Sequence, residues 1–266
     1  MKKNKKKVII IISLICVLII AGSLFLFLKN TENRNDVLNV SEKTEAEQVK
    51  TEQSEIEQVD KNNIPGFISG GEGNVCGIEL PYQIPDTALV IEGIGQYSGE
   101  FVEDGSGEPV ANVLAFFIRN NSKEFIEYEN VTFTLNDSEQ ASFKISGIPA
   151  GKCVLVMEEN KREFNRDDSM IYETQLYSER KDISLKEDEI QVYAADGELS
   201  VENISKTPFE VVYIRYKTKI LPECYLGGIT YNCTIEELAD GEKKSVKTGH
   251  FSDKSSESVM VETVEN

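Results

Sequence analysis

The stretch Ile229-Thr-Tyr-Asn-Cys-Thr-Ile-Glu236 alternates apolar and polar side chains at every position. A period of two is typical of a β-strand with one buried face and one face in water. Val131-Thr-Phe-Thr-Leu135 repeats this pattern, whereas residues 114–118 are apolar on both faces, which indicates a strand in the centre of a sheet. No segment after residue 64 sustains the 3.6-residue period of an amphipathic helix. The sequence therefore predicts an all-β fold.

Short apolar runs separated by turn residues predict the positions of the strands. Asp196-Gly197, which lies between two of these runs, is a strong signal for a short hairpin. Residues 65–85 are rich in glycine and proline and predict a loop-rich lead-in. The predicted strands are 88–91, 110–118, 131–135, 141–145, 154–157, 171–176, 190–194, 199–201, 211–216, 229–235, 245–248 and 259–264.

The two halves of this strand-rich region resemble each other. Asn120-Asn-Ser-Lys123 recurs as Asn203-Ile-Ser-Lys206 at the end of a predicted strand. A second match aligns without gaps and pairs Phe143, Ile145, Ile148 and Gly151 with Cys233, Ile235, Leu238 and Gly241. The second copy carries an insertion around residues 221–228. We predict two tandem Ig-like antiparallel β-sandwich units, residues 65–182 and 183–266, while convergence on common turn chemistry stays open as the alternative.

An apolar stretch from Val8 to Leu28 precedes these units and carries no charge. A helix of this length spans the roughly 30 Å hydrocarbon core of a bilayer. Five lysines among residues 1–7 predict a cytoplasmic tail, and hence a single-pass plasma-membrane protein with its C-terminal domains outside the cell. A cleaved signal peptide and lipidation at Cys16 are the alternatives.

Residues 29–64 contain no aromatic side chain and are dominated by charged and polar residues, which predicts a disordered acidic tether. A sparse apolar stripe within it leaves a fraying helix as an alternative. The whole chain has 28 basic and 46 acidic residues, for a net charge of -18. Without the five N-terminal lysines, the exported part has 23 basic residues and a charge of about -23. Such a surface makes nucleic acid a poor partner, because binding it relies on basic residues.

Two groups of residues are candidates for binding. Glu103, Asp104 and Glu108 cluster with glycines in an acidic turn, and calcium takes oxygen ligands from such turns. The alternative is a solvated hairpin loop. Four tyrosines near the 221–228 insertion predict a face that binds a partner protein, with burial in the core as the alternative. They are Tyr213, Tyr216, Tyr225 and Tyr231.

Four cysteines fall in the predicted exported part, a compartment that permits disulfides. Cys224 and Cys233 are near neighbours in sequence, and they could bridge a hairpin. Their spacing matches no zinc site. Separate buried thiols are the alternative.

The sequence offers no catalytic constellation. His250 is the single histidine, and no GxSxG, HExxH or phosphate-binding loop motif accompanies it. We therefore predict that the protein is not an enzyme and holds no cofactor other than calcium.

The order of anchor, charged linker and strand-rich repeats resembles the single-pass envelope proteins of low-GC Gram-positive bacteria that carry small Ig-like sandwiches. The resemblance covers roughly residues 87–264 through its strand, Asn-x-Ser and Gly-Lys turn pattern. It implies no activity and no functional residue. We expect a membrane-anchored protein that binds or scaffolds another protein at the cell envelope. The alternatives are a carbohydrate- or wall-binding module and, more distantly, an envelope hydrolase.

Overall fold

The computed structural model describes residues 59–195 and 197–265. They belong to one compact unit that begins at Val59. The predicted cytoplasmic tail, the span from Val8 to Leu28 and most of the tether lie outside the described residues. Within the described part, no helix is long and apolar enough to cross a membrane.

The described residues confirm the all-β class. They contain one short 3-10 helix, η1 (Lys61–Asn63), and sixteen strands. The strands are β1 (Phe67–Ser69), β2 (Asn74–Val75), β3 (Ile78–Glu79), β4 (Tyr82–Gln83), β5 (Leu89–Phe101), β6 (Glu108–Asn120), β7 (Phe125–Leu135), β8 (Glu139–Ile148), β9 (Cys153–Met157), β10 (Met170–Arg180), β11 (Ile190–Ala195), β12 (Glu198–Asn203), β13 (Phe209–Leu221), β14 (Cys224–Leu238), β15 (Lys243–Lys247) and β16 (Ser256–Glu265).

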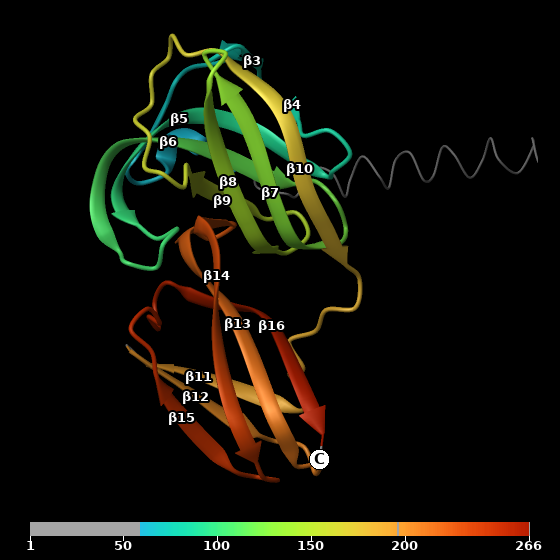
Figure 1. Cartoon of the computed structure of the whole chain (residues 1–266). Coiled ribbons are helices and arrows are strands. Elements are labelled where there is room, and N and C mark those ends of the chain that lie inside the picture. Colours follow the sequence, from blue (N-terminus) through green and yellow to red (C-terminus); the bar gives the residue numbers. More distant parts are fainter. Residues whose placement is uncertain (1–58, 196, 266) are drawn as a thin grey trace, which may run out of the picture. The chain divides into compact units, whose positions relative to one another are not determined.

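The strands form two groups with the same arrangement (Figure 1). In the N-terminal β unit (β1–β10), β5-β6-β9 form one layer and β10-β7-β8 form the other. In the C-terminal β unit (β11–β16), the layers are β11-β12-β15 and β16-β13-β14. The pairing is antiparallel within each unit, so each unit is β-sandwich-like. The predicted boundary between residues 182 and 183 falls in the connection from β10 to β11.

Each predicted strand overlaps one of the strands from β5 to β16, and only residues 88 and 248 fall outside them. The hairpin predicted at Asp196-Gly197 is confirmed, because Ala195 and Glu198 pair across the turn and Gly197 has a φ of 73°. The glycine-rich lead-in is more ordered than its composition indicated. It contributes β1 and β4 to the edge of the main sheet beside β5, and β2 and β3 as a separate small hairpin.

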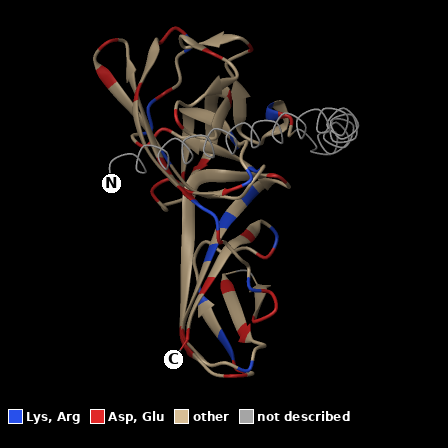
Figure 2. Ribbon diagram, turned by 90° about the vertical axis from the view of Figure 1, so that its right-hand side faces the viewer, with Lys and Arg blue, Asp and Glu red and all other residues tan. Residues whose placement is uncertain are grey.

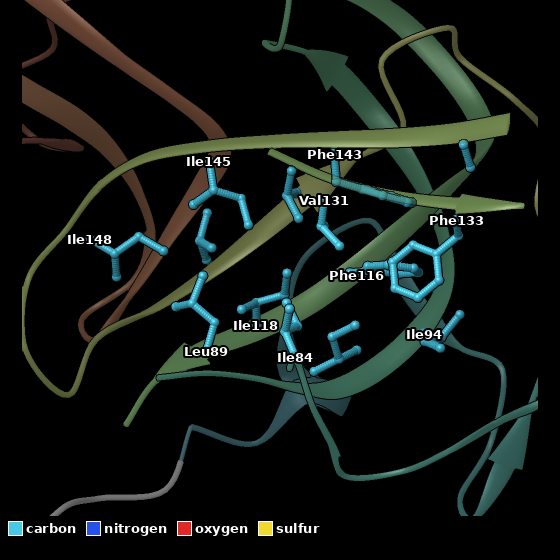
Figure 3. Packing of buried hydrophobic residues seen from close by; sticks show 14 of the residues in the cluster. Ile84, Leu89, Ile94, Phe116, Ile118, Val131, Phe133, Phe143, Ile145 and Ile148 are labelled. Atoms are coloured by element: carbon cyan, nitrogen blue, oxygen red, sulfur yellow. The ribbon is translucent and has the colours of Figure 1, made fainter. Parts of the chain in front are cut away.

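The core of the N-terminal unit lies between its two layers (Figure 3). Phe116 of β6 stacks on Phe143 of β8, with 3.9 Å between ring centroids, and it meets the ring of Phe133 of β7 edge-on. All three rings are fully buried. Burying an apolar side chain of this size stabilises the fold by about 2–3 kcal/mol, so these contacts hold the layers together.

Strand β6 has buried side chains on both faces, as the continuous apolar run from 114 to 118 predicted. Phe116 and Ile118 point into the core between the layers, whereas Ala115 and Phe117 belong to a second cluster on the other face of the same sheet. The chain entering β1 supplies Ile64 and Phe67 to this second cluster. The lead-in therefore covers a sheet face that would otherwise be exposed.

The first Asn-x-Ser site, at the end of β6, is a turn closed by side chains. Asn120 is fully buried, and its amide nitrogen donates to the carbonyl oxygens of Glu124, Ile148 and Pro149 at 2.9–3.2 Å. The amide N–H and the hydroxyl of Ser122 donate to Asn120 Oδ1, at 3.0 and 2.8 Å. Asparagine suits this position because its side-chain amide both donates and accepts hydrogen bonds here.

The second site, at the end of β12, repeats four of these five bonds. Asn203 donates to the carbonyl oxygens of Thr207 (2.8 Å) and Leu238 (3.3 Å). Its Oδ1 accepts the amide and hydroxyl of Ser205 at 3.0 and 2.7 Å. Sequence match, strand order and hydrogen bonds therefore coincide in the two units.

Candidate functional site

The β13–β14 hairpin joins the two β units. It is longer than the equivalent β7–β8 hairpin, and its tip reaches the N-terminal unit (Figure 1). There, Cys224, Tyr225 and Leu226 pair in parallel with Cys153, Val154 and Leu155 of β9. This pairing creates one continuous sheet with the order β1-β5-β6-β9-β14-β13-β16. The insertion seen in the second repeat is thus the segment that connects the units.

Two glycines allow the hairpin to approach this closely. A Cβ atom on Gly228 would lie 1.8 Å from the carbonyl oxygen of Lys144, and one on Gly227 would lie 2.2 Å from a methyl carbon of Val102. Gly227 also has a φ of 78°, a region that favours glycine. Any larger residue at these positions would push the hairpin away from the N-terminal unit.

Lys217 is fully buried at this junction. A register shift between Tyr216 and Thr218 in β13 interrupts the strand alternation at this residue. Its Nζ donates to the carbonyl oxygens of Ser146 (2.9 Å), Gly228 (3.2 Å) and Ile229 (2.6 Å). Burial lowers the pKa of Lys217 to about 7, and the charge of Glu103 acts against this shift.

Glu103 holds the same segment from the other side. Its carboxylate accepts the amide N–H of Met157 at 2.8 Å and that of Gly228 at 3.0 and 2.9 Å to its two oxygens. Burial raises the pKa of Glu103 to about 7, against the effect of these N–H groups and of Lys217. The amide and the carbonyl of Gly228 are thus bound by side chains of opposite charge.

Beside the junction lies a cavity of about 280 Å³, which we call the junction groove. Glu100 comes from the end of β5 and Ser106 from the β5–β6 turn. The hairpin contributes Thr218 and Tyr231, and the β15–β16 connection contributes His250. The groove therefore combines an acidic turn of the N-terminal unit with aromatic side chains of the C-terminal unit.

The aromatic side chains in the groove form a stack. The rings of Tyr231 and His250 lie 4.6 Å apart with 25° between their planes, and those of Tyr216 and Tyr231 lie 5.4 Å apart at 23°. Phe251 meets Tyr216 edge-on at 5.0 Å. Tyr216 and Phe251 are buried, whereas His250 is exposed, so the stack runs from the core to the surface.

The electrostatic environment of the groove is negative. Burial and the neighbouring Tyr216 raise the pKa of Tyr231, and the charges of Glu103, Glu100 and Asp104 add to the shift. Lys161 offsets part of this charge through its 3.1 Å ion pair with Asp104. A positively charged group in the groove would face both an aromatic ring and the carboxylate of Glu100, which has no ion pair among residues 59–195 and 197–265.

The structure does not bring the three predicted calcium ligands together. The carboxylate of Glu103 turns inward to Gly228, that of Asp104 accepts the Ser106 amide at 2.9 Å, and Glu108 is exposed. Across residues 59–195 and 197–265, no group of three or more His, Cys, Asp or Glu side chains could hold a metal ion. The hydrogen bonds to Asp104 lower its pKa to about 2. The turn is closed by hydrogen bonds of its own.

The four predicted interface tyrosines do not share one face. Tyr216 and Tyr225 are buried, with about 1% of their surface exposed, which agrees with the alternative prediction of burial in the core. Tyr231 pairs with Tyr216 across the hairpin and lines the junction groove. Tyr213 lies instead in a separate groove of about 460 Å³. Odd and even positions of β13 point to opposite faces, which is why 213 and 216 diverge.

The predicted disulfide between Cys224 and Cys233 does not form. Both residues lie in β14, nine positions apart. At about 3.3 Å per residue their Cα atoms are roughly 30 Å apart, whereas a disulfide requires less than about 7 Å. All four cysteines of the described residues are free and buried. Cys224 lies opposite Cys153 instead.

The groove that contains Tyr213 adjoins an ion-pair network that the sequence did not predict. Glu127 and Arg180 come from the N-terminal unit, and Arg215 and Glu262 from the C-terminal unit. Each arginine bridges both glutamates, with separations of 2.7–3.7 Å. The sequence shows only that these residues are charged. Their ion pairs could not be predicted from it, because they form only when the fold brings β7, β10, β13 and β16 together.

No protein-family model matches this sequence, and neither the curated proteins nor the solved structures contain a match.

Proposed function

We propose that this chain is a non-enzymatic, single-pass membrane protein that displays two Ig-like β-sandwich units outside the cell. The displayed units bind another protein of the envelope through the junction groove. The observation that carries this proposal is the stacked pair of Tyr231 and His250 beside Glu100. The apolar stretch from Val8 to Leu28 and its flanking lysines support the anchored topology.

The chemistry of the groove favours a basic side chain of the partner, arginine above all. A guanidinium group stacks on aromatic faces and pairs with carboxylates. Tyr216 and His250 cover the two faces of Tyr231, so the groove offers the exposed ring of His250 and the carboxylate of Glu100 for these two contacts. Acidic residues are also spread over the loops of both units, so a basic partner would be attracted from a distance (Figure 2).

The joined sheet supports a role in display. Because the sheet is continuous from β9 into β14, the acidic turn and the aromatic stack keep a fixed separation. A groove whose walls come from two β units is preorganised only when the units cannot move apart, and preorganisation increases affinity.

Affinity capture with the full chain as bait tests the proposal. Envelope extract is passed over the wild-type chain and over two variants, Glu100→Gln and His250→Ala. Both variants change exposed side chains and leave the core intact. Tyr213→Ala, in the other groove, is the matched control. We expect a stoichiometric protein partner that the wild type and the control retain and that both groove variants lose by about tenfold.

Equal recovery by all four baits would contradict the assignment to the junction groove. Retention on purified wall material, with no protein partner, would instead support the carbohydrate- or wall-binding alternative. Hydrolysis of a generic ester, peptide or glycoside by the purified chain would contradict the non-enzymatic role.

A further inference from the structure

Cys153 and Cys224 lie directly opposite each other in adjacent strands. Each is the first residue of its strand, β9 or β14, and the two are Cα partners in the parallel register. Neighbouring strands are about 4.8 Å apart, which falls within the Cα separations found in disulfides. Partners in a register point to the same face of a sheet, and both side chains belong to one buried cluster.

The two thiols are shielded from water, because neither residue has any exposed surface. Cys153 Sγ donates to the carbonyl oxygen of Glu223 at 3.1 Å, and Cys224 Sγ lies 3.8 Å from the carbonyl oxygen of Tyr225. The other cysteines of the described residues are elsewhere, with Cys76 in the core of the N-terminal unit and Cys233 in that of the C-terminal unit.

We propose that Cys153 and Cys224 form a disulfide that covalently joins the two β units. The direct pairing of β9 with β14 has only three register positions, so one covalent bond at its first position would secure a short contact. The oxidation of this pair in cells rests on the proposed location outside the cytoplasm, where disulfides persist. The capacity of the pair to form the bond rests on the geometry alone.

The bond forms by exchange with a disulfide-bearing oxidant, either a small-molecule disulfide or a thiol–disulfide oxidoreductase. The thiolate of Cys153 attacks one sulfur of the oxidant, which releases the first thiol and leaves a mixed disulfide. The thiolate of Cys224 then attacks the Cys153 sulfur and releases the second thiol. Two protein thiols lose two electrons and two protons, and the oxidant disulfide is reduced to two thiols.

The burial of both sulfurs determines when exchange occurs. An oxidant reaches them before β14 docks on β9, or when that pairing opens. Once formed, the bond is covered by Arg119, whose backbone pairs with Cys153, and by the apolar residues around it. We therefore expect slow oxidation of the folded, reduced protein and strong resistance of the folded, oxidised protein to reduction.

The test oxidises the full chain with glutathione disulfide during refolding and maps its peptides by mass spectrometry without reduction. We expect one cross-linked peptide pair containing Cys153 and Cys224, lighter than the two free peptides by two hydrogen atoms. The cross-link should persist in Cys76→Ser and Cys233→Ser and be absent from Cys153→Ala. Oxidation should raise the wild-type melting temperature by about 5–10 °C, because the bond closes a loop of some seventy residues.

If Cys153→Ala fails to fold, Cys224→Ala serves as the variant that should lack the cross-link. The peptide map of the wild-type chain is informative without either variant. The proposal is overturned if refolding in glutathione disulfide leaves both thiols free or links either one to a different cysteine. Quenching cells with acid and alkylating the denatured protein separates this from the proposed function, because denaturation exposes thiols that are buried in the folded chain. A pair that bonds in vitro but is recovered as alkylated thiols from cells would overturn the extracytoplasmic location and leave the assigned bond standing.

Discussion

Replacing Glu129 by glutamine should stabilise the protein at alkaline pH and have much less effect at acidic pH. Glu129 lies in β7 on the same face as Val131 and Phe133, and none of its surface is exposed. Among the described residues, neither of its carboxylate oxygens has a hydrogen-bond partner. A buried charge without a partner is unfavourable, and this burial raises the pKa of Glu129 to about 8 from its ordinary value of 4.5.

The sign of the effect follows from proton binding. Between pH 4.5 and about pH 8 the folded protein holds a proton that the unfolded chain releases. The free energy of unfolding therefore falls as pH rises through this window, by at most about 1.4 kcal/mol per pH unit. From pH 5 to pH 8, Glu129 should lower it by roughly 2–4 kcal/mol. Burial also raises the pKa of the neighbouring Tyr172 and Tyr177, which stay neutral over this range.

The assay is urea unfolding of the full chain and its variants at pH 5, 6, 7 and 8. Subtracting the wild-type curve from that of Glu129→Gln isolates this residue from other groups that titrate, because those remain in both proteins. We expect a small difference at pH 5 that grows to about 2–4 kcal/mol in favour of the variant at pH 8.

Glu158→Gln is the matched control, since Glu158 is equally buried but fully bonded. Its carboxylate accepts the amide N–H groups of Ser142, Asn160 and Arg162 at 2.7–3.3 Å. Replacing one of its oxygens by an amide should lower stability at every pH, by about 1–3 kcal/mol. Parallel pH curves for the wild type and Glu129→Gln would refute the reasoning about Glu129.

Four further substitutions and one control test the junction and the repeat, each by denaturant unfolding. Gly228→Ala should cost about 3 kcal/mol or more, since its Cβ would meet the Lys144 carbonyl oxygen, whereas Gly249→Ala, with open space around it, should be nearly neutral. Lys217→Met should cost about 2–4 kcal/mol, because it removes three hydrogen bonds to carbonyl oxygens; an unchanged midpoint would contradict this role. Asn120→Ala and Asn203→Ala should each cost about 2 kcal/mol, and clearly unequal losses would argue against the equivalence of the two turns.

Strands with one buried face, such as β7, were predictable because burial of one face gives the sequence a period of two. The central position of β6 was predictable for a different reason, since burial of both its faces gives a continuous apolar run. The strands of the glycine-rich lead-in were not predictable. Strands β1 to β4 are two or three residues long, and an alternating pattern needs more residues to be recognised.

The junction depends on pairings that leave no local pattern. Lys217 is buried through a register shift in β13, and nothing in the alternation of the strand announces that shift. Cys153 meets Cys224 through parallel pairing between units, so their separation along the chain gives no indication of contact. The opposite orientations of Tyr213 and Tyr216 were available in the sequence, since an odd spacing within one strand separates the faces.

The insertion around 221–228 was the one local signal of the junction, and its meaning comes from comparing the two repeats. The first hairpin, β7–β8, ends within its own unit, whereas the lengthened β13–β14 hairpin adds strand β14 to the sheet of the other unit. Two charged side chains at the junction, the half-buried Glu103 and the buried Lys217, bind backbone atoms of Gly228 in this lengthened part. A duplicated unit that differs mainly by a longer hairpin can therefore fuse with its neighbour, because the hairpin's own backbone supplies the contacts that hold the units together.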